Sequence, residues 1–194
     1  MKELYKLEGN KLVIAPTRIV INGNAITHPT DAMLISVGYK YLIIGDKINC
    51  NWYERVNIIY SEDSKYIYKN FEPIIHPNIK SLYINNCLVE LNRALENDFT
   101  WPLIDGHVVK LSQENQSDYV ACENRLLNNP ELLPYINYTF KDKSIKYYMS
   151  SIDEVKDFGK NAFLFVANQL SIYREKVLSC ELLTNEDLYK FIKK

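Results

Sequence analysis

The chain has 194 residues, of which 47% are hydrophobic and 24% are charged, as in most globular proteins. Its 23 Lys and Arg nearly balance 24 Asp and Glu, and the net charge of -1 argues against a general binder of nucleic-acid phosphates. No run of 18 apolar residues occurs and charges interrupt the first apolar stretches, so we expect neither a membrane span nor a signal peptide.

The first part of the chain is expected to form strands and one short helix. Two β-rich runs, 18–21 and 25–27, flank Asn22-Gly23, a pair that favours a tight hairpin because both residues tolerate positive φ. Thr30 is placed to cap a two-turn helix, and Gly38 is placed to end it. Further strands are expected at 39–44, 56–60 and 66–71.

Two prolines within residues 71–77 indicate a stiff spacer, so we expect a β-rich module over 1–72 and a second domain over 78–194. In this second domain we expect four helices: one from Asn78 to Asn97, a Ser112-capped helix over 113–127, a long helix from the capping box at Ser151 to Leu178, and a last helix opened by Thr184. Between them we expect a hairpin over 99–111 and paired strands at 136–140 and 145–149. The predicted fold class is α+β, with a small N-terminal β-rich module that holds one short helix. The domain that follows is mainly helical, contains two β-hairpins and has its long helix near the C-terminus.

The predicted long helix contains a stretch that is apolar on every side, Ala162–Val166, here named the apolar girdle. A surface helix cannot expose such a stretch without cost, so either the domain buries it or another chain covers it. Two tryptophans join it as candidates, because aromatic residues are enriched at interfaces. The candidate interface residues are Phe163, Leu164, Phe165, Val166, Trp101 and Trp52.

The cysteines and histidines show no motif of metal binding or catalysis. The four cysteines lie far apart in the sequence, without C-x-x-C pairs or histidines at ligand spacing. No phosphate-binding loop and no known nucleophile motif occurs. We therefore expect no catalytic residue, no metal and no cofactor, and cysteines that serve as small buried apolar groups in a reducing cytoplasm.

Two stretches together resemble modules of tailed-bacteriophage proteins. The first carries an N-G turn, a P-T-D helix start and a closing G-Y-K, although His28 stands where Asn is usual. The second resembles a phage domain of undefined function that occurs in tail proteins and tail-fibre-assembly-like proteins, although Asp98 stands where Gly is usual. Its matching residues are Cys87, Phe99-Thr100-Trp101, Asp105-Gly106-His107, the L-S-x-E-x-Q run 111–116 and the helix start 183–188.

This resemblance implies a phage protein that is made in the cytoplasm of the bacterial host and ends in the virion. The implied function is a non-enzymatic structural protein of the tail region, such as a tail, collar, ring or fibre-attachment subunit. Its implied partners are other virion or tail proteins and further copies of itself, as a homo-oligomer or ring member, with neither nucleic acid nor membrane. The family brings no catalytic residues.

Three alternatives remain open at this stage. The first is a tail-fibre assembly chaperone that is absent from the mature particle. The second is a small hydrolase using His107 and Asp105, since catalytic groups can assemble in space without a sequence motif. The third is a nucleic-acid accessory protein in which Trp52, Tyr53 and Arg55 stack on bases and contact phosphate. For Trp101 and His107, packing and turn formation within a hairpin is the competing explanation, and the one we favour.

Overall fold

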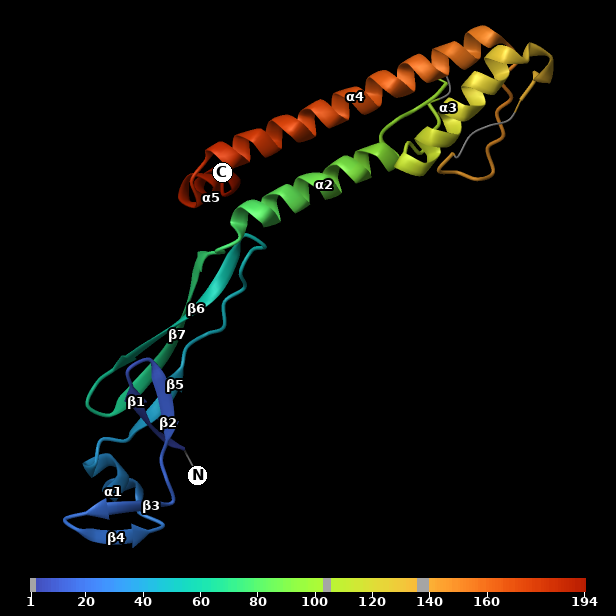
Figure 1. Cartoon of the computed structure of the whole chain (residues 1–194). Coiled ribbons are helices and arrows are strands. Elements are labelled where there is room, and N and C mark those ends of the chain that lie inside the picture. The colour runs from blue at the N-terminus through green and yellow to red at the C-terminus, as the bar shows by residue number, and fades with distance from the viewer. Residues whose placement is uncertain (1–2, 103–105, 136–139) are drawn as a thin grey trace. The chain divides into compact units, whose positions relative to one another are not determined.

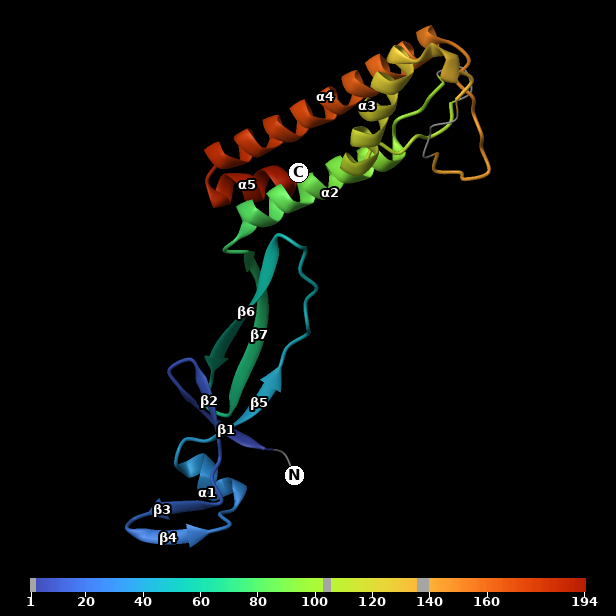
Figure 2. The same ribbon diagram turned by 45° about the vertical axis from the view of Figure 1, so that its right-hand side comes forward.

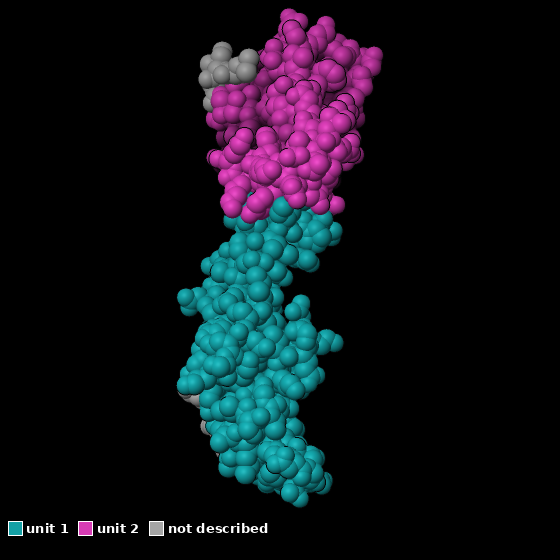
Figure 3. Space-filling model, turned by 90° about the vertical axis from the view of Figure 1, so that its left-hand side faces the viewer, with its two compact units in different colours: residues 1–79 teal, residues 80–194 magenta. Residues whose placement is uncertain are grey.

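The structure is a computed structural model of the chain that describes residues 3–102, 106–135 and 140–194. The chain divides into two compact units, Met1–Ile79 (unit 1) and Lys80–Lys194 (unit 2), which Figure 3 colours separately. Figure 1 labels the elements of both units. The division falls at the start of the first long helix.

Unit 1 is built around a mixed β-sheet. Its described elements are β1 (Leu4–Glu8), β2 (Lys11–Ile14), β3 (Arg18–Ile21), β4 (Asn24–Thr27), α1 (Asp31–Ser36), β5 (Lys40–Ile44), β6 (Glu54–Glu62) and β7 (Tyr66–Ile75). Five strands form a sheet in the order β2-β1-β5-β7-β6, and β3 and β4 form a separate hairpin. Within the sheet β5 and β7 run parallel, whereas the other neighbours are antiparallel. Figure 2 shows β6 and β7 side by side as the two long strands of an antiparallel hairpin.

Local turn and cap chemistry determines the β3–β4 hairpin and α1, as the sequence predicts. Asn22 and Gly23 both have positive φ, 49° and 79°, and join strands that pair in register up to Ile21 and Asn24. The Thr30 hydroxyl accepts a hydrogen bond from the Met33 amide at 3.4 Å. These predictions are confirmed.

The hydrophobic cluster of unit 1 is small. Leu4 of β1, Ile19 of β3 and Leu34 of α1 are its buried members. Half-buried neighbours, Tyr41 among them, surround the cluster, and the Tyr41 hydroxyl donates to the Asp31 carboxylate at 3.1 Å. The sheet therefore packs one face, near β1 and β5, against α1 and the β3–β4 hairpin.

The segment 71–77, expected to be a spacer, consists largely of strand. β7 continues to Ile75, and Pro73 pairs with Val56 of β6. Pro73 lies beyond Lys69, the last residue of β7 that pairs with β5, so β7 has only one neighbour there. A proline is tolerated at such a position because its missing N–H can face the open edge.

Unit 2 is helical. Its described elements are α2 (Ile79–Asn97, starting at the boundary), α3 (Gln113–Asn128), the 3-10 turn η1 (Pro130–Leu132), α4 (Ile152–Leu182) and α5 (Asn185–Ile192). The side chains of Ser112, Ser151 and Thr184 accept hydrogen bonds from the amides three residues later, which confirms the predicted helix starts. Figures 1 and 2 both show α2 beside α4, with α3 along the first part of α4.

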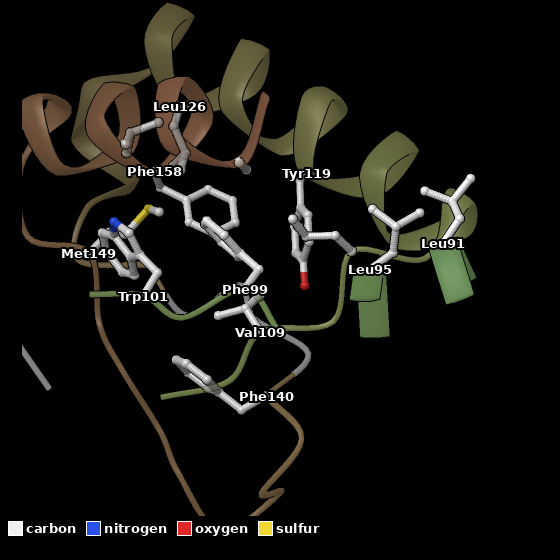
Figure 4. Close-up of a cluster of buried hydrophobic side chains, with 13 residues drawn as sticks. Leu91, Leu95, Phe99, Trp101, Val109, Tyr119, Leu126, Phe140, Met149 and Phe158 are labelled. Atoms are coloured by element: carbon white, nitrogen blue, oxygen red, sulfur yellow. The ribbon is translucent and has the colours of Figure 1, made fainter. Parts of the chain in front are cut away.

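The core of unit 2 is aromatic, and Phe158 of α4 is at its centre (Figure 4). Its ring contacts Phe99, Trp101 and Tyr119 edge-on, with centroid distances of 6.1, 5.3 and 5.1 Å. The Trp101 indole N–H donates to the Asp157 carboxylate at 3.2 Å, so its polar atom is satisfied although the side chain is buried. Residues from α3, α4 and the segment after α2 thus form one core.

The two hairpins expected in unit 2 differ from the prediction. In the first, Thr100 pairs with Val108 as an isolated bridge, and its turn residues 103–105 lie outside the described residues. In the second, residues 136–139 also lie outside the described residues, and 145–149 is not a strand. Instead Met149 pairs with Tyr135, and Phe140 pairs with Val109. Both Phe140 and Met149 are buried in the aromatic core. Their positions are therefore determined by packing in the core and not by pairing with each other in a hairpin.

The observed fold is α+β. A mixed five-strand sheet and a hairpin form the N-terminal part, and a helical region with a long helix near the C-terminus follows.

Candidate interaction surface

The apolar girdle is only partly covered by unit 2. Ala162 is buried, while Phe165 and Val166 are half-buried against the aromatic core. Phe163 and Leu164 are 71% and 53% exposed. Of the two explanations offered for this stretch, full burial within the domain is therefore wrong for the described residues, and these two side chains remain open to a partner.

An apolar groove between α3 and α4 runs beside Phe163. Its α4 wall includes Gly159, Ala162 and Phe163, and its α3 wall includes Val120 and Glu123. Phe158 and Tyr119 of the core also line it. Val120 is itself 58% exposed. The girdle thus borders a concave surface, the shape in which a partner side chain can be enclosed.

Gly159 is the residue that lets the Glu123 side chain enter this groove. A Cβ at position 159 would lie 2.6 Å from one carboxylate oxygen of Glu123 and 2.7 Å from the other. Neither residue is among the site residues predicted from the sequence. An isolated glycine inside a long helix is nevertheless a signal, because glycine disfavours helix and usually marks close packing.

A second groove continues the first toward α2. It is lined by Leu88 and Leu91 of α2 and by Val166 and Leu170 of α4, together with Gln116 of α3. Gln116 and Val166 line both grooves, so the two are contiguous. We name the combined surface the apolar surface of unit 2, and its apolar members are Leu88, Leu91, Val120, Phe163, Val166 and Leu170.

A third hollow between α2 and α4 is polar. Glu90 of α2 and Lys176 of α4 form a salt bridge of 2.8 Å, and the hydrogen bond that Lys176 donates to the Glu90 carboxylate raises the pKa of Lys176. Burial raises the pKa of the Cys87 thiol in the same hollow, and it raises the pKa of nearby Tyr83 to about 12. At neutral pH the thiol is therefore protonated, which is the inert state of a packed cysteine.

Trp52 lies in unit 1, between β5 and β6, and is 43% exposed. Its ring meets Tyr53 edge-on at a centroid distance of 5.2 Å. Arg55 follows within β6. Trp52 is thus a surface aromatic residue of unit 1, separate from the girdle of unit 2.

Trp101 is 2% exposed and belongs to the aromatic core, so it is not available to a partner in this structure. This burial supports hairpin packing as its role and removes it from the surface. His107 presents its ring edge-on to Phe140 at 5.9 Å. Asp105, its expected partner in the hydrolase hypothesis, lies outside the described residues.

No group of three or more His, Cys, Asp or Glu placed to hold a metal ion occurs among the described residues. No helix in that part of the chain combines the length and apolar character needed to cross a membrane.

Comparisons with known proteins brought no match: no family model fits the chain, and no curated protein or solved structure is significantly similar to it. The resemblance to phage modules therefore depends on the sequence motifs alone.

Proposed function

We propose that this chain is a non-enzymatic structural protein that acts through protein–protein contacts in the tail region of a bacteriophage particle. The observation that carries the proposal is the exposure of Phe163 and Leu164 in the middle of a 31-residue helix. Both are large apolar side chains on regular secondary structure, so a rigid surface presents them to a partner.

Energetics favour a covered state for these side chains. Burying one Phe or Leu side chain fully stabilises a protein or a complex by about 1.5–3 kcal/mol. Val120 adjoins Phe163 across the groove, and exposed Leu88 extends the patch along α2. Contiguous exposed apolar patches of this kind typically mark interaction sites.

The assignment to a phage tail is supported by the motifs named above. Its first module, with Asn22-Gly23 and Thr30, forms the β3–β4 hairpin and α1. Its second module includes the F-T-W stretch and the L-S-x-E-x-Q helix start, which supply Trp101 and Ser112. A tail, collar, ring or fibre-attachment subunit works by occupying a position among neighbours, and for that role an apolar docking surface suffices without a catalytic site.

The test is quantitative mass spectrometry of purified particles. We expect this chain at a stoichiometric ratio to known tail proteins, and loss of incorporation for the double substitution Phe163→Ser and Leu164→Ser. Val20→Ser in unit 1 is the control, because Val20 is similarly exposed and lies outside the surface. Absence of the wild-type chain from particles whose fibres need it for assembly would overturn the proposal in favour of an assembly chaperone.

A further inference from the structure

We infer that the α3–α4 groove binds the same groove of a second copy of this chain, with the two α4 helices antiparallel. The inference rests on the proposed function and names the partner that covers Phe163. Its starting point is the arrangement of Glu123 of α3 beside Gly159 and Phe163 of α4. The Glu123 carboxylate lies against Gly159, and Phe163 lies one helical turn beyond Gly159.

The Glu123 carboxylate is a charge without a partner in an apolar groove. Its side chain is half-buried, and it makes neither a hydrogen bond nor an ion pair with any other described residue. Val120 and Ala162, which line the groove with it, cannot supply a positive charge. Because burial disfavours an unpaired charge, a cation at this point would offset the cost. The groove therefore fits a partner that brings a Lys or Arg beside an apolar side chain.

α4 itself carries this combination. Lys160 is exposed and has no ion-pair partner among the residues the structure describes, and Phe163 follows it three positions later. Residues with that spacing are neighbours on a helix surface. Because α4 forms one wall of the groove and also carries the matching side chains, two copies can fill each other's grooves around a two-fold axis.

A specific register satisfies both requirements. An axis at Asn161 places Phe163 of one copy opposite Gly159 of the other, beside the Glu123 carboxylate that occupies the space of the missing side chain. Lys160 then lies opposite Ala162, about 4.5 Å from Gly159 along the helix at about 1.5 Å per residue. The flexible stem of lysine spans this offset, so its ammonium reaches Glu123. The two-fold contact contains the pair of Lys160 and Glu123 twice, once in each direction.

Another segment of the chain has similar chemistry. Phe191 of α5 is exposed and is flanked by Lys190 and Lys194. Docking of α5 into the groove of the next copy would be heterologous and would build rings or open chains. The two-fold contact is favoured because it covers two Phe163 side chains at once, at the point where the girdle is most exposed.

The test is sedimentation of the full-length chain over a concentration series up to about 1 mM, where weak specific association is still detected. We expect a monomer–dimer equilibrium. Phe163→Ala and Glu123→Lys should each raise the dissociation constant about tenfold or more, since central contacts dominate an interface and each change occurs twice. Combining Glu123→Lys with Lys160→Glu should restore dimerisation to within about threefold of wild type, because the pair is rebuilt with reversed charges.

The control variants are Leu182→Ala, an exposed apolar residue at the end of α4, and Lys146→Glu, an exposed lysine outside the groove. Both should dimerise as wild type does. A wild-type chain that stays monomeric, a dimer insensitive to Phe163→Ala, or a double variant without rescue would each overturn the inference. Larger assemblies abolished by Phe191→Ala would overturn it in favour of α5 docking.

The two-fold contact and the proposed structural role can each fail without the other. A monomeric chain that is present stoichiometrically in particles would overturn the two-fold contact and leave the structural role intact. A dimer that is absent from particles would support the contact and overturn the structural role.

Discussion

Units 1 and 2 differ in how much of their apolar surface they bury. Unit 2 encloses an aromatic core that includes Phe99, Trp101 and Phe158, whereas the cluster of unit 1 buries only Leu4, Ile19 and Leu34. Burial of apolar area is the main source of stability, and small units with little of it are marginal alone. Unit 2 therefore has the means to hold its surface rigid, and unit 1 depends more on its strand pairing.

The sheet of unit 1 also leaves apolar residues open on both faces. The pairing register puts Ile44 and Ile58 on one face and Ile43 and Ile59 on the other, and all four are exposed. The described part of unit 2 also exposes apolar residues, but some of them, such as Phe163 and Val120, border a well-packed core. This difference predicts that core substitutions cost more in unit 2 than in unit 1.

The largest effect is expected for Trp101→Ala. Removing a fully buried tryptophan from the aromatic core should destabilise unit 2 by about 3–5 kcal/mol. The loss should appear in denaturant unfolding followed by helical circular dichroism, while Trp52 fluorescence, which reports on unit 1, keeps its midpoint. An equal shift of both signals would mean that the units unfold as one and would contradict the comparison.

A smaller loss is expected for Leu34→Ala in unit 1. Large-to-small changes at buried leucines cost about 2–5 kcal/mol, and this site belongs near the lower limit because half-buried neighbours such as Tyr41 can relax into the space. The readout is Trp52 fluorescence during unfolding, measured in a Trp101→Phe background so that no other tryptophan contributes, with the helical signal as the internal control. A cost that matches Trp101→Ala would show that unit 1 is as well packed as unit 2.

Ser151→Ala tests the start of α4. The Ser151 hydroxyl accepts from the Glu154 amide at 3.2 Å, so its loss should destabilise unit 2 by about 1 kcal/mol. Ser151→Asp should restore stability because aspartate caps equally well. If Asp and Ala variants unfold at the same midpoint, the cap does not contribute to unit 2.

The smallest expected effect is the change in stability when Glu154 becomes protonated. The Ser150 amide, at 2.6 Å from its carboxylate, together with the Ser150 hydroxyl and Tyr147, holds the pKa of Glu154 below its ordinary value of 4.5. A lowered folded pKa means that the stabilisation is complete above the ordinary value and is lost as the pH falls through the folded one. At pH 7 the free energy of unfolding of the wild type should exceed that of Glu154→Gln by less than about 1 kcal/mol, because solvent screens the site.

The matching measurement is a series of unfolding midpoints for both proteins from neutral pH downward. The two curves should converge below the ordinary carboxyl pKa. A difference that persists unchanged in acid would show that the glutamate acts through packing instead of charge.

Features set by neighbouring residues were predictable from the sequence. The Asn22-Gly23 turn needs only its own positive φ, and Ser112, Ser151 and Thr184 need only an amide three residues away. The strands β5, β6 and β7 were predicted, whereas β1 and β2 were missed. β1 and β2 flank Gly9-Asn10, a two-residue turn in which Gly9 has φ 60°, so this hairpin was overlooked although its signal is local. The pairing of β1 with β5 depends on residues far apart in the sequence.

The candidate surface was predictable in part. The run Ala162–Val166 is apolar on every side, so Phe163–Val166 were identified from the sequence as residues that the domain or another chain must cover. The groove beside them was not identified, because it requires that Val120 and Glu123 of α3 meet Gly159 of α4. That meeting is a result of tertiary packing. The burial of Trp101 has the same origin, since its ring fits against Phe158.

Side-chain footprinting with a photoactivated carbene tests the central claim most directly. The label would be applied to the isolated chain and to the assembled particle, with modification measured at Phe163 and Leu164 and, as a reference, at exposed Val20. We predict strong modification of both girdle residues in the isolated chain and protection in the particle. Equal labelling in the two states would show that nothing covers the girdle and would contradict the proposed role.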